Sequence, residues 1–199
     1  LYEAAAAHVE ATGKRTLLDI ATRNADLVCS VFGPEPGKRR TPDGHPEVEI
    51  GLVKLWQATG RRRYLDLAAF FLERRGDPAR RDRIGEYAQD HQPLAAQREA
   101  VGHAVRAVYL YSGAADVAAL AGHPVYGPVV DRLWEDVVAG KVYVTGGIGS
   151  RGSGEAFGDA YELPNRTAYA ETCAAIGLTL WCQRMFLRHG DAKYVDVLE

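Results

Sequence analysis

Apolar residues recur along most of the chain at the three- and four-residue spacing of amphipathic helices, and almost nowhere in the alternating pattern of strands. The pattern therefore predicts a mainly helical protein, with any β-strand confined to short pieces around residues 140–150. The helices are expected near residues 1–12, 15–31, 46–58, 62–75, 95–112, 113–121, 127–138, 173–189 and 192–199.

A repeated segment accompanies the helical pattern. Residues 11–21 return as residues 58–68 at an offset of 47 residues, and a weaker copy lies at 189–197. In each copy one helical run meets a glycine, where a left-handed residue can end a helix, and a second helical run begins. A repeat of this length holds two helices and their turns. We therefore expect an all-α fold of helix pairs wound into a solenoid or a closed α/α toroid.

Two segments interrupt the helical pattern. Residues 33–44 are rich in proline and glycine, as surface loops are. Residues 140–166 form a longer segment rich in glycine and aromatic residues. Long irregular segments inside compact domains usually carry function, so we expect the chemistry of the protein in residues 140–166.

Composition and charge exclude several classes of partner. The formal net charge is −2, which gives no electrostatic reason to expect nucleic acid or an anionic membrane surface. No apolar run reaches the roughly 18 residues of a membrane span. The three cysteines are too few for a disulfide framework, which favours reduced thiols and a cytoplasmic location.

One glycine-rich motif has the spacing of a dinucleotide-binding loop. Gly147, Gly149 and Gly152 follow a strand-like segment in a G-x-G-x-x-G pattern. In that motif the third glycine opens a helix, but here loop-forming residues continue as far as Pro164. We therefore favour a turn-rich loop that lines a pocket, with nucleotide binding as the weaker alternative.

Acidic and aromatic residues gather in the same part of the chain. Aromatic rings beside carboxylates suit sugars, and glycosidic cleavage needs a protonated carboxylic acid near the leaving oxygen. Loop acids are more commonly just solvated, and that alternative stays open for each of them. The acids are Glu155, Asp159, Glu162 and Glu171, and the aromatic residues are Phe157, Tyr161 and Tyr169.

Glu171 and Cys173 form a candidate metal-binding pair, because carboxylates and thiolates both bind zinc. Residues i and i+2 point to nearly opposite sides of a helix, so the pair can share an ion only at a helix start. Thr172 is a plausible N-cap for a helix beginning at Cys173. An inert, buried cysteine is the alternative, and we interpret Cys182 and Cys29 in that way.

Two histidines stand out by their position. His45 comes just before a predicted helix, and His103 lies within one, among small residues. A histidine in such a setting can be a core residue with one partner, or it can face a ligand.

Four motifs run in order along nearly the whole chain: residues 44–49 (GHPEVE), 99–107 (EAVGHAVRA), 143–150 (YVTGGIGS) with 154–157 (GEAF), and 169–174 (YAETCA). Together they resemble glycoside hydrolase family 127, whose type activity is β-L-arabinofuranosidase. The last two motifs are the most specific.

The resemblance implies an (α/α)6 barrel and a single zinc ion held by one glutamate and three cysteines, one of which is the nucleophile. It also implies that Glu155 is the general acid/base, that Glu171 and Cys173 are zinc ligands, and that His45 and His103 contact arabinose hydroxyls.

The chain also departs from the family pattern. The family has an adjacent pair of cysteines after the Glu-x-Cys motif, and a sugar-binding histidine just before the segment matched by Leu1; neither occurs here. We therefore expect residues 1–199 to be part of a single catalytic (α/α)6-barrel domain, truncated at both ends. Such a segment carries the acid/base and two zinc ligands, lacks the nucleophile and is expected to be inactive alone.

The expected function is that of a retaining hydrolase that releases L-arabinofuranose from the non-reducing ends of β-L-arabinofuranosides. The expected partners are arabinosides, with a homo-oligomer as a further possibility and with neither nucleic acid nor membrane. Two alternatives stay open: a glycosidase of the same fold for a different sugar, and a non-catalytic carbohydrate-binding or helical scaffold protein.

Overall fold

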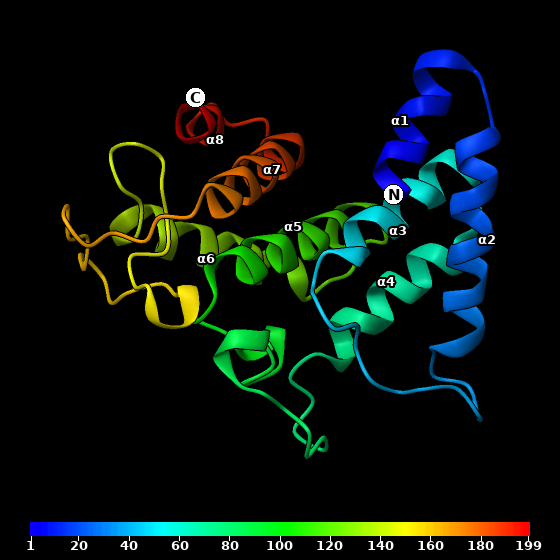
Figure 1. Cartoon of the computed structure of the whole chain (residues 1–199), viewed down its shortest axis with the longest axis horizontal. Coiled ribbons are helices and arrows are strands. Elements are labelled where there is room, and N and C mark those ends of the chain that lie inside the picture. The colour runs from blue at the N-terminus through cyan, green and yellow to red at the C-terminus, as the bar shows by residue number, and fades with distance from the viewer.

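The computed structural model describes all 199 residues, which form eight α-helices and three short 3-10 turns (Figure 1). The α-helices are α1 (Tyr2–Thr12), α2 (Thr16–Val31), α3 (Val48–Thr59), α4 (Arg62–Arg74), α5 (Ala104–Leu120), α6 (Tyr126–Gly140), α7 (Thr172–His189) and α8 (Lys193–Leu198). The 3-10 turns are η1 (Glu86–Ala88), η2 (Leu94–Ala96) and η3 (Ser153–Glu155). None of the α-helices is both long and apolar enough to cross a membrane.

The helices are arranged as four hairpins. Each odd-numbered helix packs against the helix that follows it, and α1, α3, α5 and α7 also contact one another in sequence. The odd-numbered helices therefore form one layer, and the even-numbered helices lie against it. This two-layer array of hairpins confirms the predicted all-α class and has the arrangement of a segment of an (α/α)6 barrel.

A left-handed glycine lies in the short turn of every hairpin. The sequence repeat predicted three of them, Gly13, Gly60 and Gly190, and they have φ angles of 69°, 70° and 68°. Each donates its backbone N–H to a carbonyl in the last turn of the preceding helix, which ends that helix. The turn between α5 and α6 contains a fourth such residue, Gly122, with φ of 66°. The repeat did not reveal it.

The three long connections join each even-numbered helix to the next odd-numbered one. They comprise residues 32–47, 75–103 and 141–171. Because the two helices of a hairpin run in opposite directions, these connections lie at the opposite end of each hairpin from the glycine turns.

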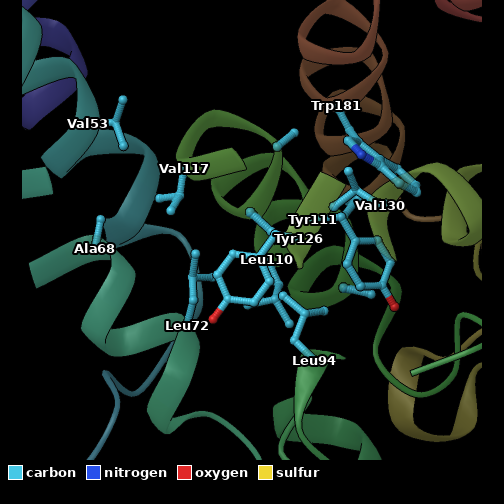
Figure 2. Packing of buried hydrophobic residues seen from close by; sticks show 14 of the residues in the cluster. Val53, Ala68, Leu72, Leu94, Leu110, Tyr111, Val117, Tyr126, Val130 and Trp181 are labelled. Carbon is cyan, nitrogen blue, oxygen red and sulfur yellow. The ribbon is translucent and has the colours of Figure 1, made fainter. Parts of the chain in front are cut away.

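The core is a single cluster of 40 buried residues centred on α5. Figure 2 shows side chains from α3 to α7 meeting there. Trp181 of α7 packs on Tyr111 of α5 with ring centroids 5.0 Å apart. Cys182 is fully buried and its sulfur accepts a hydrogen bond from the indole of Trp134, as expected for a core residue. Residues from all eight α-helices contribute to this one core.

The prediction of helices at 95–112 and 113–121 is wrong. A single helix, α5, spans Ala104–Leu120, and the preceding segment is irregular apart from η2. Gly102 has φ of 69° and lies against the carbonyl of Glu86, so no helix can pass through it. Gly113, the expected break, is inside α5 and lets the backbone approach the side chain of Glu49.

The expected short strands around residues 140–150 are also absent. Only isolated bridges occur, such as the one between Val142 and Ile148. The glycine-rich sequence bends the chain back after a few residues, which leaves no room for a ladder.

Candidate active site

The candidate residues lie in the long connections and at the starts of the odd-numbered helices. His45 precedes α3, His103 is the N-terminal cap of α5, and Glu171 is the N-terminal cap of α7. Glu155 ends η3 in the longest connection. Chain segments far apart in sequence therefore meet at one end of the helical layer.

Glu155 is held in an unusual backbone conformation. Its φ of 51° is in the left-handed region, where residues other than glycine are uncommon. Two hydrogen bonds between the backbones of Arg151 and Ala156 close the turn around it. The next residue, Phe157, donates its N–H to the carbonyl of Gly102, which ties the turn to the start of α5. Strain of this kind is typical of functional sites.

The structure corrects the position of His103. It is not within a helix but caps α5, and its Nδ1 accepts the backbone N–H of Arg106 at 3.2 Å. An accepting Nδ1 leaves the ring proton on Nε2. Nε2 lies 2.6 Å from Oε2 of Glu155, so His103 donates a hydrogen bond to that carboxylate. The cap thus fixes the tautomer that faces the acid.

A second donor reaches the other oxygen of Glu155. The hydroxyl of Tyr169 donates to Oε1 at 3.0 Å, and this bond to a carboxylate raises the pKa of Tyr169. The side chain of Glu155 still has 38% of its surface exposed. Both carboxylate oxygens are therefore oriented while the group remains open to a ligand.

Glu171 and Cys173 lie side by side at the start of α7. The predicted cap is off by one residue: Glu171, with an extended backbone, is the N-cap, and Thr172 is the first helical residue. Oε2 of Glu171 is buried without a hydrogen-bond partner. The thiol of Cys173 is hydrogen-bonded to the Glu171 carboxylate, which raises the pKa of that thiol.

The donor atoms of His103, Glu155 and Glu171 lie within 4.8 Å of one another, close enough to bind one metal ion. This group shares Glu171 with the predicted pair Glu171 and Cys173, but it adds His103 and Glu155 and does not contain Cys173. The candidate acid Glu155 is therefore itself a member of a possible cation site.

His45 lies apart from this group. Its Nδ1 is buried without a hydrogen-bond partner and is 3.8 Å from Oε2 of Glu47. Burial and the nearby positive charge of Arg106 lower the pKa of His45. No hydrogen bond joins it to His103 or Glu155, so a ligand would have to span the space between them.

The other two candidate acids have a different partner. Glu162 forms a two-pronged ion pair with Arg151, which lowers the pKa of Glu162 to about 2. Asp159 lies 3.1 Å from the same guanidinium. Glu162 and Asp159 therefore form ion pairs within the connection 141–171, whereas Glu155 is directed to His103.

The glycine motif does not form a nucleotide-binding turn. A Cβ on Gly149 would lie 2.9 Å from the Cβ of Ala104, so the motif packs closely on the start of α5. No parallel sheet is present, and the segment after Gly152 continues as η3 and irregular loop. The interpretation as a turn-rich loop is confirmed.

Two residues that sequence reasoning did not select also belong to the site. The ring of Tyr87 meets the ring of His103 edge-on at 4.9 Å, and the guanidinium of Arg106 lies over the Tyr87 ring at 4.9 Å. Arg106 lies within a motif that resembles the family, whereas nothing in the local sequence around Tyr87 marks it.

Comparison with known proteins identifies the family of this chain. Residues 1–199 match the model of the β-L-arabinofuranosidase GH127 catalytic domain. The fold and the match together define a glycoside hydrolase catalytic-domain segment. The chain belongs to the GH127 β-L-arabinofuranosidase family.

Individual relatives show the extent of the similarity. A non-reducing end β-L-arabinofuranosidase from Bifidobacterium longum is 39% identical over 99% of this chain and 33% of its own length. A solved GH127 β-arabinofuranosidase is 54% identical, with a TM-score of 0.93 over 99% of this chain and 31% of that one. A GH127 β-L-arabinofuranosidase from Geobacillus stearothermophilus T6 is 41% identical, with a TM-score of 0.94 over 99% and 34%. The chain thus spans about a third of the length of these relatives.

Proposed function

We propose that residues 1–199 supply the acid/base part of the active site of a retaining β-L-arabinofuranosidase that acts on non-reducing ends. The observation that carries the proposal is the Glu155 carboxylate, which is oriented by Tyr169 and His103 and partly open to solvent. Family membership supplies the sugar and the linkage.

Glu155 would act first as an acid and then as a base. Its two carboxylate oxygens accept hydrogen bonds from Tyr169 and His103, and the carboxylate of Glu171 lies close by. A carboxyl group that is oriented and partly exposed in this way can protonate the leaving oxygen of the glycoside. The ionised form can then take a proton from the water that releases the sugar, which gives retention of configuration.

The bond to the sugar would be formed by a thiolate from outside residues 1–199. None of the three cysteines here is part of an adjacent pair, and Cys29 and Cys182 lie away from Glu155 in the helical frame. The thiolate attacks the anomeric carbon as the leaving oxygen departs with the proton from Glu155. Glu155 is therefore the only residue of this chain to which we assign a proton-transfer step.

Glu171 and Cys173 have the donor chemistry of a zinc site. Glu171 has a buried carboxylate oxygen without a hydrogen-bond partner, and the thiol of Cys173 is hydrogen-bonded to the same carboxylate. Both groups are zinc ligands when ionised. When bound, zinc would supply the positive charge that keeps ligating thiols deprotonated. The remaining ligands would come from outside residues 1–199.

His45 and His103 would bind hydroxyl groups of the sugar. The unpartnered Nδ1 of His45 is a buried polar atom that a hydroxyl could satisfy. His103 presents its ring next to Glu155, so the sugar would lie between the two histidines with its leaving oxygen toward the acid.

The whole enzyme can be tested with a panel of methyl glycosides. We expect cleavage of methyl β-L-arabinofuranoside, with NMR showing the β-anomer of arabinose as the first product. Cleavage of a different methyl glycoside at a higher kcat/KM would favour a different sugar for the same fold. Lack of hydrolysis across the panel, with sugar binding retained, would favour a carbohydrate-binding protein.

A further inference from the structure

Arg106 forms hydrogen bonds next to both candidate sugar-binding histidines, to His103 itself and to the residue before His45. Its backbone N–H donates to Nδ1 of His103, and its guanidinium lies over the ring of Tyr87, which itself contacts His103. From the same side chain, Nη1 donates to the carbonyl of Gly44 at 2.8 Å, one residue before His45. Arg106 therefore contacts His103 directly and, through its guanidinium, the residue that precedes His45.

The guanidinium is suited to fix a distance. It is planar, and its donors have a fixed geometry, so a stacked and hydrogen-bonded arginine has little freedom to move. Its contact with Tyr87 is a cation–π interaction, which holds the plane of the group as well as its position.

A second arginine, Arg75, also binds the turn before His45. Arg75 is almost fully buried, and its Nη2 donates to the carbonyl of Asp43 at 3.1 Å and to the carboxylate of the same residue. The adjacent carbonyls of Asp43 and Gly44 are therefore bound by two different arginines, one that caps the C-terminus of α4 and one from α5. Arg106 is the one that connects this turn to His103.

We propose that Arg106 is a positioning residue that sets the spacing and orientation of His45 relative to His103, and thereby the fit of the furanose ring. The inference rests on the proposed function for its consequence in catalysis. The geometric part, that Arg106 holds the segment 43–49, does not depend on which sugar is bound.

Arg132 provides a matched control. It donates Nε to the carbonyl of Gln97 at 2.8 Å and Nη2 to the carbonyl of Ala95 at 3.1 Å, and it contacts neither histidine. Replacement of either arginine by alanine removes a guanidinium bound to backbone carbonyls, so a general loss of stability should be similar in the two variants.

The test uses Arg106→Ala, Arg106→Lys and Arg132→Ala in the whole enzyme. For Arg106→Ala we expect KM for methyl β-L-arabinofuranoside to rise about tenfold, which corresponds to about 1.4 kcal/mol of binding free energy, with a smaller fall in kcat. Amide hydrogen exchange should become faster in residues 43–49 in the same variant. Arg106→Lys should restore only part of the KM, because lysine has the charge but not the planar fork.

Arg132→Ala should leave both KM and the exchange of residues 43–49 as in the wild type. The proposal is overturned if Arg106→Ala leaves KM unchanged, or if Arg132→Ala changes KM and exchange to the same extent. If the wild-type enzyme cleaves no arabinoside, the proposed function fails, but the exchange comparison still decides whether Arg106 holds the turn.

Discussion

Glu49 and Asp43 form a buried acid pair behind the turn that carries His45. Glu49 is completely buried, and burial together with the charge of Asp43 raises its pKa well above the ordinary value. If both groups were ionised, both oxygens of Glu49 and Oδ2 of Asp43 would be buried without partners. A proton on one oxygen of Glu49, donated to Asp43, pairs two of these three atoms, and Arg75 then balances the charge of Asp43.

This assignment predicts how stability depends on pH. A carboxyl group with a raised pKa in the folded state binds more protons when folded, so its contribution to stability is present below the unfolded pKa of about 4.3 and falls as pH rises through the folded value. Glu49→Gln keeps a donor toward Asp43 and cannot ionise. The unfolding temperature of this variant should therefore rise relative to that of the wild type as pH increases above about 4.3.

Glu10→Gln is the control, because Glu10 is exposed on α1. Its difference from the wild type should not vary with pH in the same way. If the difference between Glu49→Gln and the wild type stays constant from acid to neutral pH, Glu49 is not the proton carrier.

At the same scale, sequence reasoning selected the candidate residues but not their contacts. Glu155, Glu171 and Cys173 were candidates from their residue chemistry, and the family resemblance then gave them roles and added His45 and His103 as sugar contacts. The hydrogen bond from His103 to Glu155 joins residues 52 positions apart, and only the folded chain brings them together. Tyr87 carries no local signal at all, because its role depends on the ring of His103 and the charge of Arg106.

At the scale of helices and turns, the sequence was most informative where a single residue type dictates the backbone. The glycines that end α1, α3 and α7 were predictable because only glycine adopts positive φ without strain. The start of α5 was not predictable, because most residues from Ala95 to Val101 favour a helix, although the helix begins only at Ala104. Tertiary contacts hold that segment in irregular form: the N–H of Ala100 donates to the carboxylate of Asp136, and the ammonium of Lys141 donates to the carbonyl of Ala100.

The newly found turn glycine can be tested by substitution. Gly122→Ala should destabilise the protein by about 1 kcal/mol, since φ is positive and the space around a Cβ is empty, so that only backbone strain acts. Gly152→Ala is a matched change at φ of −68°, where alanine fits, and it should be neutral or slightly stabilising. Thermal unfolding of the whole enzyme measures both. Equal effects of the two changes would show that backbone conformation is not the cause.

At the scale of the whole molecule, the two ends of the four hairpins differ in structure and in the residues that they carry. Short glycine turns close one end, and the candidate site residues lie at the other end, in the long connections or, for Cys173, in the first turn of α7. The repeat in the sequence predicted this helical frame. It could not predict how the connections fold, because their structure depends on contacts such as Phe157 to Gly102 and Arg151 to Glu162.

The distribution of ligands predicts the behaviour of residues 1–199 expressed alone. Tetrahedral zinc sites take three or four protein ligands, and here Glu171 and Cys173 are the proposed pair. We expect zinc well below one ion per chain by metal analysis, and no hydrolysis of arabinosides. One tightly bound zinc per chain together with measurable turnover would show that the site is complete within these residues, and the proposed division of ligands would be wrong.

The central claim is that Glu155 transfers the proton in arabinoside cleavage, and the most direct test is Glu155→Gln in the whole enzyme. The amide keeps the shape and can still accept hydrogen bonds, but it cannot deliver a proton, so turnover of methyl β-L-arabinofuranoside should fall by about 10²–10⁴-fold. Asp159→Asn, in the same loop with 88% of its side chain exposed, should retain nearly full activity. Turnover of the methyl arabinoside by Glu155→Gln within a few-fold of the wild type would contradict the account.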